Sequence, residues 1–223
     1  YSKSDSSTKE NIDISPKPPG APESINIVSV SYNLEQMLVT WLPAMSTNDS
    51  ITYHLYYSDM EDGTKELLDE MTDRNEITYS ITDFDPTHEN WFWMKVTDFW
   101  GREYWGEGMT NEIDSPPTQI DISSVTYDLS EMVVIWEQSS DNDFVSYELL
   151  YSDTEGGEHI SITTITYIYT TSYTISDFNP LEERWYWIKV TDYWSLSTMS
   201  NGYMVIDSPP TQIDISSVTY DLT

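Results

Sequence analysis

The chain has 223 residues, a formal net charge of −30 and no cysteine. The charge repels nucleic-acid phosphates and anionic lipid headgroups, so neither is an expected partner, and the absence of cysteine excludes disulfides and thiolate metal sites. No apolar run reaches the ~18 residues that a membrane span needs. The evenly spread carboxylates are typical of a solvated acidic surface, and they suit a medium salty enough to screen their repulsion.

The first segment, residues 1–21, is polar and ends in a stretch containing Pro16, Pro18, Pro19 and Gly20. This composition predicts a leader or linker rather than a folded domain. The chain begins at Tyr1, without a Met and without a signal-like apolar stretch. We therefore expect a processed or excised product.

The rest of the chain predicts two similar domains, 22–114 and 115–207, followed by a truncated third repeat at 208–223. The segment SPPTQIDISSVTYDL begins at Ser115 and recurs unchanged over fifteen residues from Ser208, 93 positions later. A period of this length corresponds to a whole domain and not to one turn of a solenoid. We expect the chain to be a piece of a longer array.

Within each repeat, apolar and polar residues alternate over short segments, as they do in half-buried strands. The first strand is expected at 25–30 and at 120–125. Three later strands are indicated by sets of apolar residues that recur in both repeats. Met37, Val39 and Trp41 correspond to Met132, Val134 and Trp136, and Tyr53, Leu55 and Tyr57 correspond to Tyr147, Leu149 and Tyr151. Tyr79, Ile81 and Phe84 correspond to Tyr173, Ile175 and Phe178. About seven short strands per repeat, with no helical periodicity, predict an all-β sandwich.

Each repeat resembles a fibronectin type III domain. The matching features are a proline before the first strand, a tryptophan ending the second strand (Trp41, Trp136), a third strand reading Tyr-x-Leu-x-Tyr-Ser, a Phe-x-Pro turn, and an aromatic-rich sixth strand that runs into a Thr-Asp turn. The resemblance implies tandem seven-stranded, immunoglobulin-like β-sandwiches with binding or spacing roles, usually outside the cell or on its surface. The second repeat departs from the first by carrying Ser195 in place of Gly101.

From these features we expect a non-enzymatic structural or adhesive protein of rigid acidic repeats, such as a stalk, surface layer or fibre. Its partners would be neighbouring repeats or subunits, a polysaccharide or a surface protein. The proline pairs Pro116-Pro117 and Pro209-Pro210 should stiffen the joints into an elongated array. No nucleophile, phosphate-loop or zinc motif occurs, and the three histidines have no repeated partners.

An alternative function is binding through aromatic residues of the sixth strand. If Phe92, Met94 and Val96 face the core, their neighbours face outward. The outward set would be Trp91 and Trp93 with Tyr56 in the first repeat, and Trp185 and Trp187 with Leu150 in the second. Three uses remain open: stacking on sugar rings, contact with another domain or subunit, and local packing beneath lysine stems.

Three further features suggest sites. Trp100, Trp105 and Trp194 follow the sixth strand and could make an interdomain contact, or pack locally at a sheet edge.

Asp141 and Asp143 offer oxygen ligands of the kind that calcium prefers, although the tendency of Asp to form turns explains these residues as well. No other cofactor is expected. Residues 213–220 repeat a first strand and could pair with the sheet edge of a neighbouring molecule, although both complete repeats already own this strand.

Overall fold

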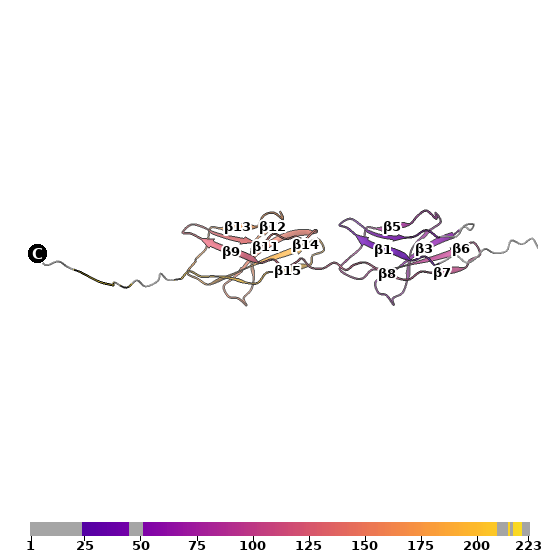
Figure 1. The fold of residues 1–223 in the computed structure, drawn as a ribbon. Coiled ribbons are helices and arrows are strands. Elements are labelled where there is room, and N and C mark those ends of the chain that lie inside the picture. The colour runs from indigo at the N-terminus through magenta and orange to yellow at the C-terminus, as the bar shows by residue number, and fades with distance from the viewer. Residues whose placement is uncertain (1–23, 45–50, 209–213, 215, 220–223) are drawn as a thin grey trace, which may run out of the picture. The chain divides into compact units, whose positions relative to one another are not determined.

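The computed structural model describes residues 24–44, 51–208, 214 and 216–219, and within them the chain forms strands and no helix. The all-β class predicted from the alternating apolar residues is therefore confirmed. The chain divides into two compact units, the first ending at Ile113 and the second beginning at Asp114 (Figure 1). No helix long and apolar enough to cross a membrane is found in the described part of the chain.

Unit 1 consists of two sheets that face each other. The smaller sheet has the order β1-β2-β5, and the larger has the order β4-β3-β6-β7, with β8 also paired to β6. The strands are β1 (Ile27–Tyr32), β2 (Met37–Trp41), β3 (Ile51–Ser58), β4 (Glu66–Met71), β5 (Thr78–Ile81), β6 (Trp91–Asp98), β7 (Glu103–Trp105) and β8 (Met109–Thr110). Because β7 and β8 pair with successive parts of β6, they are two halves of one interrupted seventh strand.

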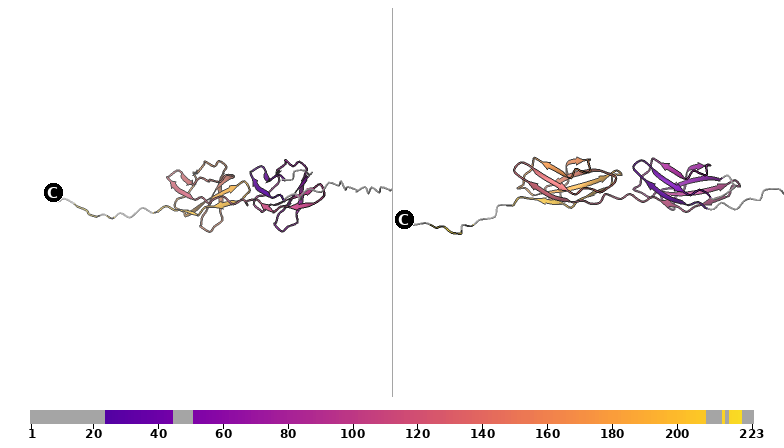
Figure 2. Two further views of the ribbon diagram at one scale, coloured as in Figure 1. Left: turned by 45° about the vertical axis from the view of Figure 1, so that its right-hand side comes forward. Right: turned by 45° about the horizontal axis from the view of Figure 1, so that its top comes forward.

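Unit 2 repeats this arrangement strand for strand. Its sheets have the orders β13-β10-β9 and β12-β11-β14-β15, with β16 also paired to β14. The strands are β9 (Ile122–Tyr127), β10 (Met132–Trp136), β11 (Phe144–Ser152), β12 (Ile160–Ile165), β13 (Ser172–Ile175), β14 (Arg184–Asp192), β15 (Ser197–Met199) and β16 (Tyr203–Val205). Figure 2 shows the two layers of each unit from two further directions.

The core of each unit lies between its sheets and is built from the alternating residues. Met37, Val39 and Trp41 of β2 are all fully buried, whereas the residues between them are partly exposed. The Trp41 ring lies 6.1 Å from that of Tyr53, whose hydroxyl accepts a hydrogen bond from the backbone N–H of Ala44 at 2.9 Å. Unit 2 has the same pair and the same bond at the equivalent positions, Trp136, Tyr147 and Ser139.

The first strand of each unit begins two residues later than predicted, at Ile27 and Ile122. Ile25 and Ile120 are nevertheless buried. An irregularity in the pairing follows Ile27 and Ile122 in both units. The sequence pattern predicts which residues are buried, but burial does not mark the residue at which hydrogen bonding to the neighbouring strand begins.

Three sequence predictions fall wholly or partly outside the described residues. These are the leader at 1–21, the proline pair Pro209-Pro210, and the tail at 213–220, of which residues 213, 215 and 220 lie outside the described part. Of the tail, residues 214 and 216–219 form no strand. A strand needs a neighbour to pair with, and β10, the partner of the first strand, is already flanked by β9 and β13 in this chain.

Candidate functional site

The predicted aromatic residues of β6 and β14 lie on the sheet face away from the core, as their alternation with core residues requires. Phe92, Met94 and Val96 belong to the core cluster of unit 1, and Trp93 does not. The cross-strand neighbours are also those expected, since Tyr56 pairs with Trp93 and Leu150 with Trp187. The predicted face therefore exists in both units.

The central side chains of this face point away from the core but are nevertheless buried. Trp93 is 6% exposed, Trp187 5% and Leu150 6%, while Trp91, Trp185 and Tyr56 are partly buried. Residues distant in sequence cover them. The Nζ of Lys65 lies 4.1 Å from the ring centroid of Trp93, and the ring of His159 lies 4.2 Å from that of Trp187. This is the local packing that the sequence left open as one of three uses.

Glycines complete the cover in both units. A Cβ on Gly108 would overlap the indole of Trp93, with Cε2 at 2.8 Å, and one on Gly202 would lie 3.0 Å from Nε1 of Trp187. The segment between the two halves of the seventh strand therefore passes directly over the tryptophan. Only a residue without a side chain allows this approach.

The residues considered for an interdomain contact have contacts within their own units. Trp105 is 44% exposed and packs on Tyr56 with a centroid distance of 4.7 Å. Trp100 is 41% exposed and lies against the guanidinium of Arg102. Trp194 makes an edge-to-face contact with Tyr193. Of the joint prolines that the structure describes, Pro116 is exposed and Pro117 is buried.

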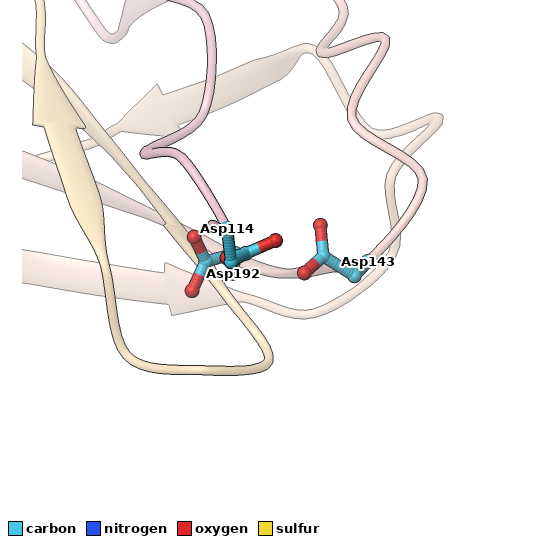
Figure 3. Close-up of side chains that lie close together, drawn as sticks. All are labelled: Asp114, Asp143 and Asp192. Carbon is cyan, nitrogen blue, oxygen red and sulfur yellow. The ribbon is translucent and has the colours of Figure 1, made fainter. Parts of the chain in front are cut away.

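A cluster of carboxylates lies at one end of unit 2 and starts from the turn after β14. Asp192 ends this strand, and its Oδ1 accepts a hydrogen bond from the N–H of Leu196 at 2.8 Å. The N–H of Tyr193 donates to the carbonyl of Asp143 at 2.9 Å, which ties this turn to the loop before β11. A third segment, leading toward β9, brings Asp114 to the same place (Figure 3).

The carboxylates of Asp114, Asp143 and Asp192 present oxygens that all lie within 4.8 Å of one another. Asp192 is 2% exposed, and its Oδ2 is buried without a hydrogen-bond partner among the described residues. Asp141, partly buried in the loop before β11, likewise has a buried Oδ2 that makes no hydrogen bond within the described part of the chain. Four carboxyl groups thus share one small region.

The electrostatics of the carboxylate cluster show how unfavourable it is without a counter-ion. Burial, followed by the charge of Asp143 and a hydrogen bond to it, raises the pKa of Asp141 to about 6. Burial also raises the pKa of Asp192, with further contributions from Asp143 and Asp114. Each group holds its proton more tightly because its neighbours are negative and water is partly excluded.

In unit 1 an arginine neutralises the equivalent buried carboxylate. Asp98 is the counterpart of Asp192, and its Oδ2 lies 2.6 Å from the Nε of Arg102. Burial acts to raise the pKa of Asp98, but hydrogen bonds and charge from Arg102 outweigh it and the pKa is lowered. The residue in the equivalent place in unit 2 is Leu196, whose backbone makes the same turn bonds.

Asp141 and Asp143 were predicted from the sequence as calcium ligands, and the structure places Asp143 in the cluster with Asp141 nearby. Asp114 and Asp192 come from other segments and were not predicted. The replacement of Arg102 by Leu196, at aligned positions of the two repeats, was the one sequence signal that could have found Asp192.

Comparison with known proteins gives matches among solved structures alone. No protein-family model matches the chain, and no curated protein matches it. The FN1-FN3 domains of chicken CNTN1 are 15% identical, with a TM-score of 0.37, covering 84% of this chain and 68% of that one. The sixth fibronectin type III domain of human fibronectin type III domain containing protein 3 is 20% identical, with a TM-score of 0.37, covering 47% of this chain and 96% of that one.

A pectate lyase structure, Pel3 from Pectobacterium carotovorum, matches at 13% identity and a TM-score of 0.35 over 44% of this chain and 29% of that one. Identities this low concern the fold and not the activity. The fold is settled by the strand order, with a three-stranded sheet of first, second and fifth strands packed on a sheet of third, fourth, sixth and seventh. Both units therefore have the strand order of immunoglobulin-like β-sandwiches, and the solved structures they are similar to include fibronectin type III domains.

Proposed function

We propose that this chain is a non-enzymatic structural segment of an extracellular or cell-surface protein, in which the sandwiches act as acidic spacers that hold other parts apart. The supporting observation is that the two units repeat one design, with the same strand order, the same buried Trp–Tyr pair and the same glycine-covered tryptophan. A unit with its own core is expected to fold independently.

The histidines support a role without catalysis, because each takes part in a local structural contact. His54 bonds the hydroxyl of Thr97 at 3.0 Å, His88 lies 3.2 Å from a carboxylate oxygen of Asp85, and His159 packs on Trp187. Burial and the nearby ammonium of Lys95 lower the pKa of His54. No histidine of one unit has a histidine as its counterpart in the other: the place of His159 over Trp187 is taken in unit 1 by Lys65 over Trp93.

A force measurement on single molecules of the whole chain tests the spacer role. Each unit should unfold in a single event that releases about 300 Å of contour length, given ~90 residues at ~3.4 Å each. Antibodies raised against the chain should also label intact cells of the source. Extension at low force without discrete events, or labelling that requires permeabilised cells, would contradict the proposal.

A second candidate function is glycan binding at unit 1, favoured by one observation. A hollow on this unit is lined by Trp93 and the half-exposed Trp105, together with Lys65, Glu61 and Glu107. Aromatic rings beside carboxylates provide stacking and hydrogen bonding for sugar rings. In unit 2 the residue equivalent to Trp105 is Met199, because Trp105 pairs with Lys95 and Met199 pairs with Lys189, the counterpart of Lys95.

Pull-down on insoluble polysaccharides distinguishes this second candidate from the spacer role. Trp105→Ala should reduce retention about 5- to 10-fold, because a stacked ring contributes about 1–1.5 kcal/mol, while the matched Met199→Ala should leave retention unchanged. Equal retention of both variants, or none by the unaltered chain, would leave the spacer role as the better account.

A further inference from the structure

We propose that the cluster of Asp114, Asp141, Asp143 and Asp192 in unit 2 is a calcium site, and that the cation takes the place of the arginine that neutralises the equivalent aspartate of unit 1. This site is independent of the proposed spacer role. It rests on three observations: the spacing of the oxygens, a buried carboxylate oxygen without a partner, and the exchange of arginine for leucine between the repeats.

The spacing fits a single calcium ion. Calcium binds its oxygen ligands at about 2.3–2.6 Å, so two ligands on opposite sides of the ion lie about 5 Å apart and all others lie closer. The oxygens of Asp114, Asp143 and Asp192 lie within 4.8 Å of one another, which allows all three to contact one ion. Figure 3 shows that they come from three separate segments.

The buried oxygen indicates where the ion would lie. Asp192 is 2% exposed, and its two carboxylate oxygens have different surroundings. Oδ1 accepts a hydrogen bond from the turn, whereas Oδ2 has no hydrogen-bond partner within the described residues although it is shielded from water. An unpartnered buried carboxylate oxygen is costly, and a cation bound beside it removes that cost.

Unit 1 supplies an internal comparison. The turns after β6 and β14 have the same backbone bonds, with Asp98 accepting from Arg102 and Asp192 accepting from Leu196. In unit 1 the guanidinium carries the positive charge that the buried carboxylate needs. Unit 2 keeps the buried carboxylate, carries Leu196 in place of the arginine and holds Asp114 and Asp143 beside it. This set of oxygens matches the ligands that calcium prefers.

The site is tested by first removing metal ions from the whole chain with EDTA and then titrating it with CaCl₂ up to about 10 mM. This concentration range covers the dissociation constants of the weaker calcium sites in extracellular modules. Isothermal titration should give one site per chain. The melting temperature of unit 2 should rise by about 10 °C when calcium is at ~100 times its Kd, whereas NaCl at matched ionic strength should not reproduce this rise.

Isosteric variants identify the residues involved. Asp192→Asn and Asp143→Asn should each weaken calcium binding at least 10-fold, and both should make the calcium-free chain more stable, because they remove like-charge repulsion. Loss of binding through misfolding would instead lower the stability of the calcium-free chain. The matched variant Asp98→Asn in unit 1 should leave the calcium affinity unchanged.

A substitution that transfers the arginine completes the test. Leu196→Arg should pair with Asp192, raise the calcium-free melting temperature and abolish the calcium-dependent rise. The proposal would be overturned if the unaltered chain gave no heat of calcium binding. It would also be overturned if Asp192→Asn, Asp143→Asn and Leu196→Arg all kept the full calcium response.

Discussion

Asp98 and Asp192 end equivalent strands and form equivalent turns, yet their pKa values move in opposite directions. Arg102 lowers the pKa of Asp98 against the effect of burial, while burial and neighbouring carboxylates raise that of Asp192. The Arg102 side chain, whose place Leu196 takes in unit 2, and the neighbouring carboxylates Asp143 and Asp114 both contribute to this contrast. The state of a buried carboxylate is thus decided by what lies within a few ångströms of it and not by its place in the fold.

The same turn holds one strained residue. Ser195 has a φ of 70°, and the glycine in its place in unit 1, Gly101, has a φ of 77°. A residue with a side chain is disfavoured in this left-handed region. We predict that Ser195→Gly stabilises unit 2 by about 0.5–1 kcal/mol, measured by urea unfolding. Gly101→Ser should destabilise unit 1 by a similar amount, and a gain in both variants would contradict this explanation.

The pH dependence of unit 2 follows from Asp141. Its pKa is about 6 in the folded chain against an ordinary value of 3.8, so the folded state binds this proton more tightly than the unfolded state. The stabilisation is absent above pH ~6 and develops as the pH falls toward 3.8. Calcium-free unit 2 should therefore be more stable at pH 5 than at pH 7.

Asp141→Asn checks this assignment. Burial is the main cause of the raised pKa of Asp141, and the carboxylates of Asp143, Asp192 and Asp114 add to it. Removing the Asp141 carboxyl should therefore reduce the gain in stability between pH 7 and pH 5. As a control, Asp128→Asn removes a carboxyl whose pKa is lowered by hydrogen bonds from Ser130 and should keep the gain. An Asp141→Asn variant with the full pH dependence would refute the assignment.

At the scale of elements, the interrupted seventh strand explains why the sixth-strand tryptophans are buried. β7 and β8 pair with different parts of β6, and the segment between them crosses the outer face of Trp93. β15 and β16 do the same over Trp187 in unit 2. An outward-facing position on a strand therefore need not be an exposed one.

Alanine substitutions at the covering glycines should test this packing. Gly108→Ala should cost about 1–3 kcal/mol, because the new methyl group overlaps the Trp93 ring, and Gly202→Ala should cost less because its nearest contacts are longer. Gly156→Ala is the control, since a Cβ there meets nothing within 4 Å, and its effect should stay within about 0.5 kcal/mol. Chemical unfolding followed by tryptophan fluorescence measures all three.

At the scale of the whole molecule, the charge of −30 is the dominant electrostatic feature. Only nine lysines and arginines are present to offset 39 acidic residues. Such an excess keeps a protein soluble but destabilises its compact state through self-repulsion. A medium of moderate salinity is therefore the condition in which these units should be most stable.

We predict that NaCl stabilises both units. Raising its concentration from 0.01 to 0.1 M shortens the screening length from about 30 to about 10 Å, so the melting temperatures should rise by a few degrees. KCl should act equally, because screening does not depend on the identity of the cation. This separates the effect from the proposed calcium site, and melting temperatures that stay flat or fall would show that repulsion is not limiting.

Much of the fold could be predicted from the sequence because it depends on local alternation. Met37, Val39 and Trp41 indicate a strand and its buried face without reference to anything else, and the duplicated segment at Ser115 and Ser208 shows that the design is repeated. The starts of the first strands were predicted less well, since ladder pairing depends on the neighbouring strand.

The amino-acid sequence by itself determined the all-β class, the two repeats, the faces of the strands and the acidic surface, because each is a property of composition or of spacing along one segment. Only the tertiary structure decided that Trp93 and Trp187 are covered, and that Asp114 and Asp192 join Asp143. Both outcomes depend on segments far apart in the chain. Their approach is fixed by the packing of two sheets and by the loops that this packing brings together.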